Sequence, residues 1–166
     1  MHHAGAEGTL PLFFLDRRVW AVVIVPMAQS HIAAIAAIEQ ACFSEPWSAA
    51  ALAEELDNPP AVFLAAVEGE SVLGYVGMHH VVDEGFITNV AVAPAARRRG
   101  VARALLAALT AYGREHALYR ITLEVRVGNS PARALYEGEG YVLDGVRPKF
   151  YSHPTEDAAI YSLYFQ

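Results

Sequence analysis

The chain is poor in cysteine and in charge, and it has no hydrophobic run long enough to cross a membrane as a helix. Cys42 is the single cysteine of the 166 residues, so no internal disulfide can form and a reducing compartment is expected. The longest apolar run, residues 19–28, is interrupted by Pro26 and falls short of the roughly 18 residues that a membrane helix needs. Charged residues make up 18% and hydrophobic residues 54%, which excludes disorder of the whole chain and predicts a packed core.

Sequence patterns that bind metals or nucleoside triphosphates are also missing. His79 and His80 are adjacent in a predicted strand, so their side chains point to opposite faces and cannot share a metal ion. The other histidines show no metal-ligand spacing, and we predict no metal site. No Gly-Lys-Ser/Thr sequence is present, which excludes the phosphate loop of nucleotide hydrolases, and the chain has no dinucleotide-binding fingerprint.

Charge is distributed unevenly along the chain. The formal net charge of −6 argues against non-specific binding to nucleic acid, and we predict no direct nucleic-acid partner. Residues 1–83 carry a net charge of −8, whereas residues 84–166 carry a net charge of +2. Four of the twelve cationic residues lie between Arg97 and Arg103. This compact basic cluster is therefore the first candidate binding site.

Hydrophobic periodicity predicts a mixed sheet with helices packed on it. Residues 1–18 fit no element and are predicted to be an extension, and residues 19–166 are predicted to be one domain. Strands are predicted at residues 20–26, 61–67, 72–82, 86–93, 120–127, 141–146 and 158–165. Helices are predicted at residues 30–42, 48–56, 100–117 and 130–140, with Ser30, Ser48 and Ser130 as caps. Consecutive antiparallel strands followed by a strand–helix–strand unit indicate an α/β fold with a mixed sheet.

The basic cluster lies between a predicted strand and the start of the longest predicted helix. A helix N-terminus carries about +0.5 charge and unpaired N–H groups, so arginines there are unfavourable unless an anion lies between them. Gly100, with the small Ala102 close by, lets a ligand approach the backbone. The pattern predicts a phosphate or pyrophosphate site, with a solvated basic turn as the alternative.

The segment Arg97-x-x-Gly100-x-Ala102 follows a strand that reads Asn89-Val90-Ala91-Val92-Ala93-Pro94, and it resembles the acetyl-CoA-binding signature of the GNAT superfamily of N-acetyltransferases. Further segments resemble the branch that acetylates protein α-amino groups, in particular the RimI type, which acts on the N-terminal alanine of a small-subunit ribosomal protein. These segments are Ile38-Glu39-x-x-Cys42-Phe43-x-x-Pro46-Trp47-Ser48, Leu123-Glu124-Val125-Arg126-x-x-Asn129, Ala134-Leu135-Tyr136-Glu137-x-x-Gly140-Tyr141, and Tyr151 with Glu156-Asp157-Ala158. The resemblance runs from about residue 20 to the C-terminus. It implies the GNAT fold, with a mainly antiparallel sheet, one splayed parallel pair of strands (residues 86–93 and 120–127) and about four helices.

The resemblance implies acetyl-CoA as co-substrate and a set of residues that bind it. Main-chain groups of Val90, Ala91 and Val92 would pair with the pantetheine arm, in a strand that also suits a plain core. A donor there would polarise the thioester carbonyl. The pyrophosphate would be held by Arg98, Arg99, Gly100, Val101, Ala102 and Arg103. Arg97 or Arg103 would reach the 3′-phosphate, and Asn129 would hydrogen-bond the cofactor.

Two residues match the proton-transfer groups of the family. Glu124, on the polar face of its strand, would accept the proton of the amine directly or through water; the alternative is an exposed glutamate paired with Arg126 or Arg133. An α-amino group has a pKa near 8, so a base of modest strength suffices. Tyr136 would protonate the departing sulfur; the alternative is an aromatic anchor for its helix. Cys42 is expected to be structural, with direct transfer in a ternary complex.

The acceptor side is expected from residues 43–47 and from the C-terminal hairpin near Phe150 and Tyr151, where Phe150 replaces one of two tyrosines common in the family. Five acidic residues are expected beside this entrance, where they would attract a cationic N-terminus. They are Glu39, Glu45, Glu54, Glu55 and Asp57. The resemblance implies a cytoplasmic α-amino acetyltransferase with a protein or peptide N-terminus as acceptor, a ribosomal protein as the candidate, no membrane partner, and a monomeric or weakly dimeric state. The alternatives are a family member that acts on a small amine or a lysine side chain, and a non-catalytic acyl-CoA-binding module.

Overall fold

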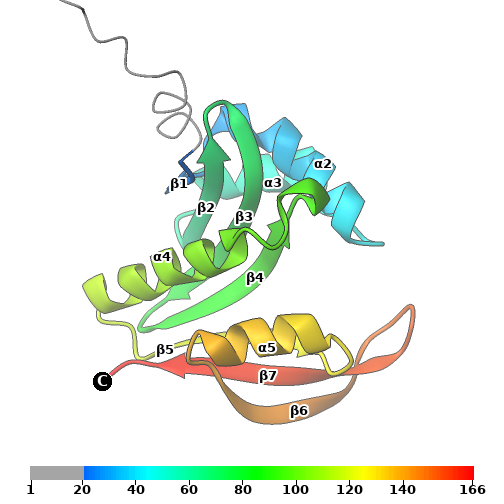
Figure 1. The fold of residues 1–166 in the computed structure, drawn as a ribbon. Coiled ribbons are helices and arrows are strands. Elements are labelled where there is room, and N and C mark those ends of the chain that lie inside the picture. Colours follow the sequence, from blue (N-terminus) through cyan, green and yellow to red (C-terminus); the bar gives the residue numbers. More distant parts are fainter. Residues whose placement is uncertain (1–20) are drawn as a thin grey trace, which may run out of the picture.

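The computed structural model describes residues 21–166, which form one sheet with helices packed on it (Figure 1). The predicted extension, residues 1–18, lies outside the described residues, as does the start of the first predicted strand. The strands are β1 (Val23–Pro26), β2 (Ala61–Glu68), β3 (Ser71–Val81), β4 (Glu84–Val92), β5 (Arg120–Arg126), β6 (Val142–Tyr151) and β7 (Glu156–Tyr164). The α-helices are α2 (Ile32–Cys42), α3 (Ala49–Glu54), α4 (Val101–Glu115) and α5 (Ser130–Gly138). Within residues 21–166, no helix is long and apolar enough to cross a membrane.

The sheet has the strand order β1-β2-β3-β4-β5-β7-β6 and contains one parallel pair, β4 and β5, within the described residues. These two strands pair only between Glu84–Phe86 and Arg120–Thr122. Beyond that point they diverge, which Figure 1 shows as a wedge between β4 and β5. The predicted mixed sheet with a splayed parallel pair is therefore confirmed.

The two faces of the sheet are covered by different helices, since β2 and β3 are buried on both sides. Ala65 and Tyr75 belong to the core that packs against α2. Their neighbours Ala66 and Val76 point the other way and belong to the core that contains α4 and α5. Figure 1 shows α4 and α5 in front of the sheet and α2 and α3 behind it.

The three predicted helix caps have different outcomes. Ser48 caps α3, because its Oγ accepts a hydrogen bond from an N–H of the first turn at 3.0 Å. Ser30 lies in a short 3-10 helix that precedes α2 and does not cap it. Helix α5 is capped by Asn129 rather than by Ser130, since the Asn129 side chain accepts from the Ala132 N–H at 3.2 Å.

Strand β6 extends to Tyr151 rather than ending near residue 146. Pro148 and the charged residues around it are typical of a loop, but β6 is the edge strand of the sheet, where a proline removes no ladder hydrogen bond. The pairing with β7 is irregular between Arg147 and Tyr151. The longer strand brings Arg147 to Glu124 of β5 and brings Tyr151 to the wedge.

Candidate active site

The free edge of β4 presents backbone groups to the wedge. The Ala93 N–H donates to a carbonyl of β3 at 2.8 Å. Because the backbone groups of a strand alternate between its two edges, Ala91 also faces β3, whereas Val90 and Val92 face the opening. Of the three residues predicted to pair with the pantetheine arm, two are thus oriented to do so.

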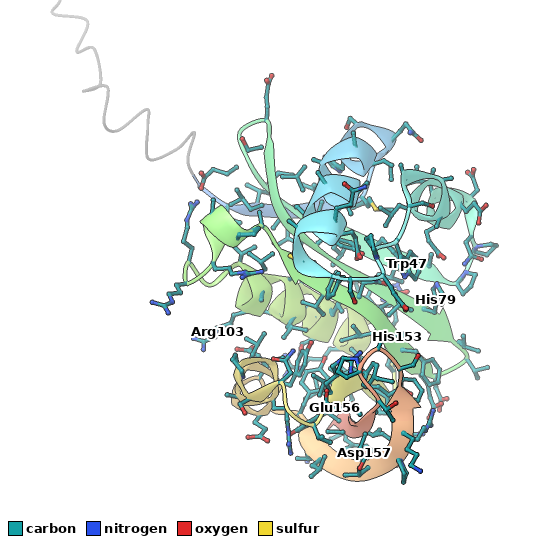
Figure 2. All side chains as sticks on the ribbon, turned by 90° about the vertical axis from the view of Figure 1, so that its right-hand side faces the viewer. Trp47, His79, Arg103, His153, Glu156 and Asp157 are labelled. Atoms are coloured by element: carbon teal, nitrogen blue, oxygen red, sulfur yellow. The ribbon has the colours of Figure 1, made fainter. Side chains whose placement is uncertain are left out.

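A cavity of about 530 Å³ opens where β4 and β5 diverge, and we refer to it as the wedge cavity. It is walled by the loop between α2 and α3, by β4 and β5, by α5 and by the end of β6. Both predicted catalytic side chains, Glu124 of β5 and Tyr136 of α5, line it. Figure 2 views the molecule from this side, with Trp47 above the wedge and His153 and Glu156 below.

Glu124 forms an ion pair with a residue that the sequence analysis did not identify. Its Oε1 lies 3.3 Å from Nη1 of Arg147 in β6. The expected alternative partners are engaged elsewhere, because Arg126 binds the β6–β7 loop and Arg133 donates to Tyr161 and to a backbone carbonyl. A pairing of Glu124 with Arg126 or Arg133 is therefore wrong, and the carboxylate remains at the wall of the wedge cavity.

Tyr136 is 8% exposed and packs its ring against Tyr141 and Tyr161, with centroids 5.9 and 6.4 Å apart. Burial, with a smaller contribution from the neighbouring Tyr151, raises the pKa of Tyr136 to about 12. The hydroxyl therefore carries its proton at neutral pH. The ring anchors α5 to the core, and the residue also lines the wedge cavity, so both expected roles are compatible with one position.

A second cavity, of about 750 Å³, lies at the start of α4, and we refer to it as the arginine cavity. Gly100 is the N-cap with φ of 75°, and a Cβ at this position would meet nothing within 4 Å. The first backbone bond of the helix runs from the Ala104 N–H to the Gly100 carbonyl, so the N–H groups of residues 101–103 have no partner inside the helix. This turn can therefore hold an anion with its main chain.

Three of the four arginines of the basic cluster line this cavity, namely Arg97, Arg98 and Arg103. Arg99 does not, because its guanidinium forms an ion pair with Glu68, a buried residue at the end of β2. Arg103 pairs with Glu139 at the end of α5, with Nε 2.9 Å from Oε1, and remains 70% exposed. The Arg99 side chain is thus directed away from a ligand in the arginine cavity, although its backbone is part of the turn.

The two cavities adjoin at the start of α5, because Asn129 and Ala132 line both of them. The side-chain carbonyl of Asn129 caps the helix, which leaves the side-chain NH₂ group for a ligand. Gly128 comes directly before Asn129. Its N–H donates to Oε2 of Glu156 at 2.7 Å, and a Cβ at 128 would lie 2.7 Å from the same oxygen. Glycine therefore permits the contact that holds this loop.

Arg126 fixes the β6–β7 loop at the rim of the wedge cavity, a role that the sequence analysis missed. Its guanidinium donates to the carbonyls of Pro154 and Ser152 at 2.9 and 3.3 Å and to Oε1 of Glu156 at 3.2 Å. It also lies 4.5 Å from the centroid of the Tyr151 ring. The available signal was strand alternation, which places Arg126 on the same polar face as the predicted base.

Cys42 lies at the wall of the wedge cavity between two predicted cofactor-binding residues. Its thiol donates to the Val92 carbonyl at 3.4 Å, and Nη2 of Arg97 lies 3.6 Å from its sulfur. No histidine, aspartate or glutamate joins it in a group that could hold a metal ion, as judged over residues 21–166. These contacts agree with a structural role for Cys42.

Of the five acidic residues expected beside the acceptor entrance, two line the wedge cavity. These are Glu45, whose side chain is 76% exposed, and Glu39, which is 1% exposed. Two of the five expected acids thus line the cavity itself. The remaining three lie at or after the end of α3 and do not line the cavity.

Residues 32–141 match the acetyltransferase (GNAT) family. The splayed sheet and this match define the class of protein as an acyl-group transferase with the GNAT fold. The chain belongs to the GNAT family of acetyltransferases, as the sequence resemblance predicted.

Particular relatives and solved structures include enzymes named for N-acetylation of a ribosomal protein at alanine. A ribosomal protein bS18-alanine N-acetyltransferase of Haemophilus ducreyi is 33% identical over 132 residues, which cover 76% of this chain and 89% of the relative. The crystal structure of the ribosomal-protein-S18-alanine N-acetyltransferase from Escherichia coli is 28% identical, with a TM-score of 0.80, over 87% of this chain and 94% of that one. A chain of the NatC complex bound to Gag peptide and CoA is 26% identical, with a TM-score of 0.75, over 87% and 99% of the two chains.

Proposed function

We propose that this chain is an acetyl-CoA-dependent α-amino acetyltransferase, and that its acceptor is the N-terminal alanine of ribosomal protein bS18. The relatives that carry this activity in their names match over most of both chains. The observation that carries the proposal is the pair of adjoining cavities, one beside an anion-binding helix start and the other lined by Glu124 and Tyr136. Such an acceptor would place the enzyme in the cytoplasm.

In this proposal the cofactor spans the two cavities. Its pyrophosphate lies in the arginine cavity, on the N–H groups of residues 101–103 and beside Arg98. The pantetheine arm passes the free edge of β4, where Val90 and Val92 present hydrogen-bonding groups. An N–H of this edge would polarise the thioester carbonyl as negative charge develops on its oxygen. Asn129, at the junction of the cavities, supplies its amide NH₂ group.

The wedge cavity then holds the acceptor amine and the groups that move its proton. The amine nitrogen attacks the thioester carbon, and Glu124 accepts the proton from nitrogen, directly or through water. As the carbon–sulfur bond breaks, the Tyr136 hydroxyl donates its proton to the sulfur, and the products are the acetylated N-terminus and free CoA thiol. The raised pKa of Tyr136 keeps this proton available at neutral pH.

The experiment that tests the proposal is transfer to peptides with defined N-termini. The protein is mixed with acetyl-CoA and a peptide of the bS18 N-terminal sequence, and release of CoA thiol is followed. The same peptide with a blocked N-terminus and an internal lysine is the control. Acetylation of the first peptide alone is expected. Acetylation of the blocked peptide would favour a lysine acetyltransferase, and no transfer despite binding of acetyl-CoA would contradict an enzymatic role.

A further inference from the structure

Glu39 is a buried carboxylate in the last part of α2 that the proposed reaction does not use. The residue is 1% exposed, and its two oxygens accept hydrogen bonds from three different elements. Oε2 accepts from the Trp47 N–H at 3.2 Å. Oε1 accepts from the Asn89 amide of β4 at 3.1 Å and from the Tyr75 hydroxyl of β3.

Within the part of the chain that the structure describes, no cation accompanies this buried charge. Within residues 21–166, no lysine, arginine or histidine forms a salt bridge with Glu39. A buried carboxylate without a counter-ion is costly, so its three hydrogen-bond donors must be held in place to keep it stable. Burial and the hydrogen bond to Glu39 both raise the pKa of Tyr75, which therefore remains a donor over the whole physiological range.

The carboxylate links the two walls of the wedge cavity. Trp47 belongs to the loop between α2 and α3, and Asn89 comes directly before Val90 at the free edge of β4. Trp47, Asn89 and Val90 all line the cavity. The Trp47 ring packs on Phe63, with centroids 6.1 Å apart, which supports the loop from behind. The position of the loop over β4 therefore depends on the hydrogen bonds to Glu39.

Glu39 also sets the orientation of the Asn89 amide. An ionised carboxylate accepts only, so the NH₂ group of Asn89 must face Glu39. The carbonyl Oδ1 is then turned the other way, and it is buried without a hydrogen-bond partner in the described residues. An unpartnered buried acceptor is uncommon, and because this oxygen is closed to solvent, a donor can reach it only if the side chains that cover it shift as a ligand enters the cavity.

We propose that Glu39 is a positioning residue of the acceptor site. It holds the loop of residues 43–47 over β4 and orients Asn89 so that its Oδ1 receives a hydrogen bond from the incoming amino group. The second part rests on the proposed function, because it requires an amine acceptor. Asn89 thus contacts the acceptor, and Glu39 acts through it.

The test compares Glu39→Gln and Asn89→Ala with Glu54→Gln, a matched substitution at an exposed glutamate of α3. A glutamine at 39 keeps the size of the side chain but places an NH₂ group against one set of donors. We expect the acceptor KM of both test variants to rise about tenfold or more, and the Kd for acetyl-CoA to stay within about twofold of the wild type. The double variant Glu39→Gln/Asn89→Ala should raise the acceptor KM no more than the more severe single variant does, because both substitutions act through the Asn89 side-chain amide. Glu54→Gln should behave as the wild type.

A second measurement needs no catalysis. Hydrogen exchange of the Trp47 amide should be faster in Glu39→Gln than in Glu54→Gln, with exchange in α4 unchanged. Unchanged Trp47 exchange together with an unchanged acceptor KM would overturn the proposal, as would an equal loss of acetyl-CoA binding. If Glu39→Gln does not fold, Tyr75→Phe, which removes one donor and leaves the carboxylate, is measured in the same way. If the wild type acetylates no peptide, the proposed function fails, and the exchange data still decide whether Glu39 holds the loop.

Discussion

Arg147 of β6 lies against Glu124 of β5, with its Nη1 3.3 Å from the carboxylate Oε1, at the wall of the wedge cavity. The guanidinium also lies 5.3 Å from the centroid of the Phe150 ring. The two side chains are 54% and 35% exposed, and ion pairs of this kind contribute only about 0–1 kcal/mol. The pair is therefore weak enough for an amino group that enters the cavity to displace Arg147 from Glu124.

This relationship separates the effects of the two residues on the reaction. Glu124→Gln removes the proton acceptor, and we expect kcat to fall by roughly 10²–10⁴-fold, with acetyl-CoA binding unchanged. Arg147→Gln leaves the carboxylate free, and we expect kcat/KM to change by less than about tenfold. Both are measured as CoA release with a peptide that begins with alanine. A loss in Arg147→Gln as large as that in Glu124→Gln would mean that the ion pair itself is required for catalysis.

Removal of the Tyr136 hydroxyl tests the proton donor. We expect Tyr136→Phe to lower kcat by about 10²-fold or more, because the departing sulfur then lacks its proton donor. Burial favours the neutral phenol and raises its pKa to about 12, so wild-type kcat should show no decline from loss of this proton between about pH 8 and 10.

The control for Tyr136 is Tyr141→Phe. The Tyr141 hydroxyl is buried without a hydrogen-bond partner in the described residues, so its removal should be neutral or stabilising and should leave kcat unchanged. A wild-type rate that falls near pH 9 and loses this fall in Tyr136→Phe would contradict the expected protonation of Tyr136.

Features that are determined by residues close together in the sequence could be predicted from it. The order of elements, the splayed strands and the helix start at Gly100 follow from hydrophobic period, a glycine and the resemblance. The direction in which each arginine side chain points could not be predicted, because it depends on partners that are distant in the sequence. Arg99 lies in the predicted anion site, yet it points to Glu68 because β2 ends beside it.

The register of the edge strand explains why the contact between Arg147 and Glu124 could not be predicted from the sequence. Pro148 made the end of β6 look like a loop, and only pairing with β7 shows that the strand continues and brings Arg147 to Glu124.

In the sequence, Glu39 is one residue of a motif, with no sign that its carboxylate is buried. Its burial and its three donors follow from the packing of α2 against β3 and β4, which no local pattern reports.

Gly100→Ala should weaken acetyl-CoA binding more than it weakens the fold. The left-handed φ of 75° costs an alanine about 1 kcal/mol, and its Cβ would project into open space where a pyrophosphate is proposed to lie. We expect the Kd for acetyl-CoA to rise about tenfold or more, measured by calorimetry, with a small fall in Tm. Gly138→Ala in α5 is the control, since its Cβ also meets nothing and its backbone is helical. Equal Kd values for the two variants would contradict the proposed pyrophosphate position.

Arg97 and Arg103 are the two candidates for the 3′-phosphate, and their contacts distinguish them. Arg103 is already paired with a carboxylate, Glu139, at 2.9 Å. Within residues 21–166, the guanidinium of Arg97 has only the Cys42 sulfur, at 3.6 Å, as a hydrogen-bond partner. The charge of Arg97 is therefore less compensated, and we expect it to bind the 3′-phosphate. The measurement is the ratio of Kd values for CoA and 3′-dephospho-CoA in each variant. Arg97→Gln should bring this ratio close to one, while Arg103→Gln should keep most of the wild-type ratio, because Glu139 already offsets part of its charge. The reverse result would assign the 3′-phosphate to Arg103 and would require its ion pair with Glu139 to open when the cofactor binds.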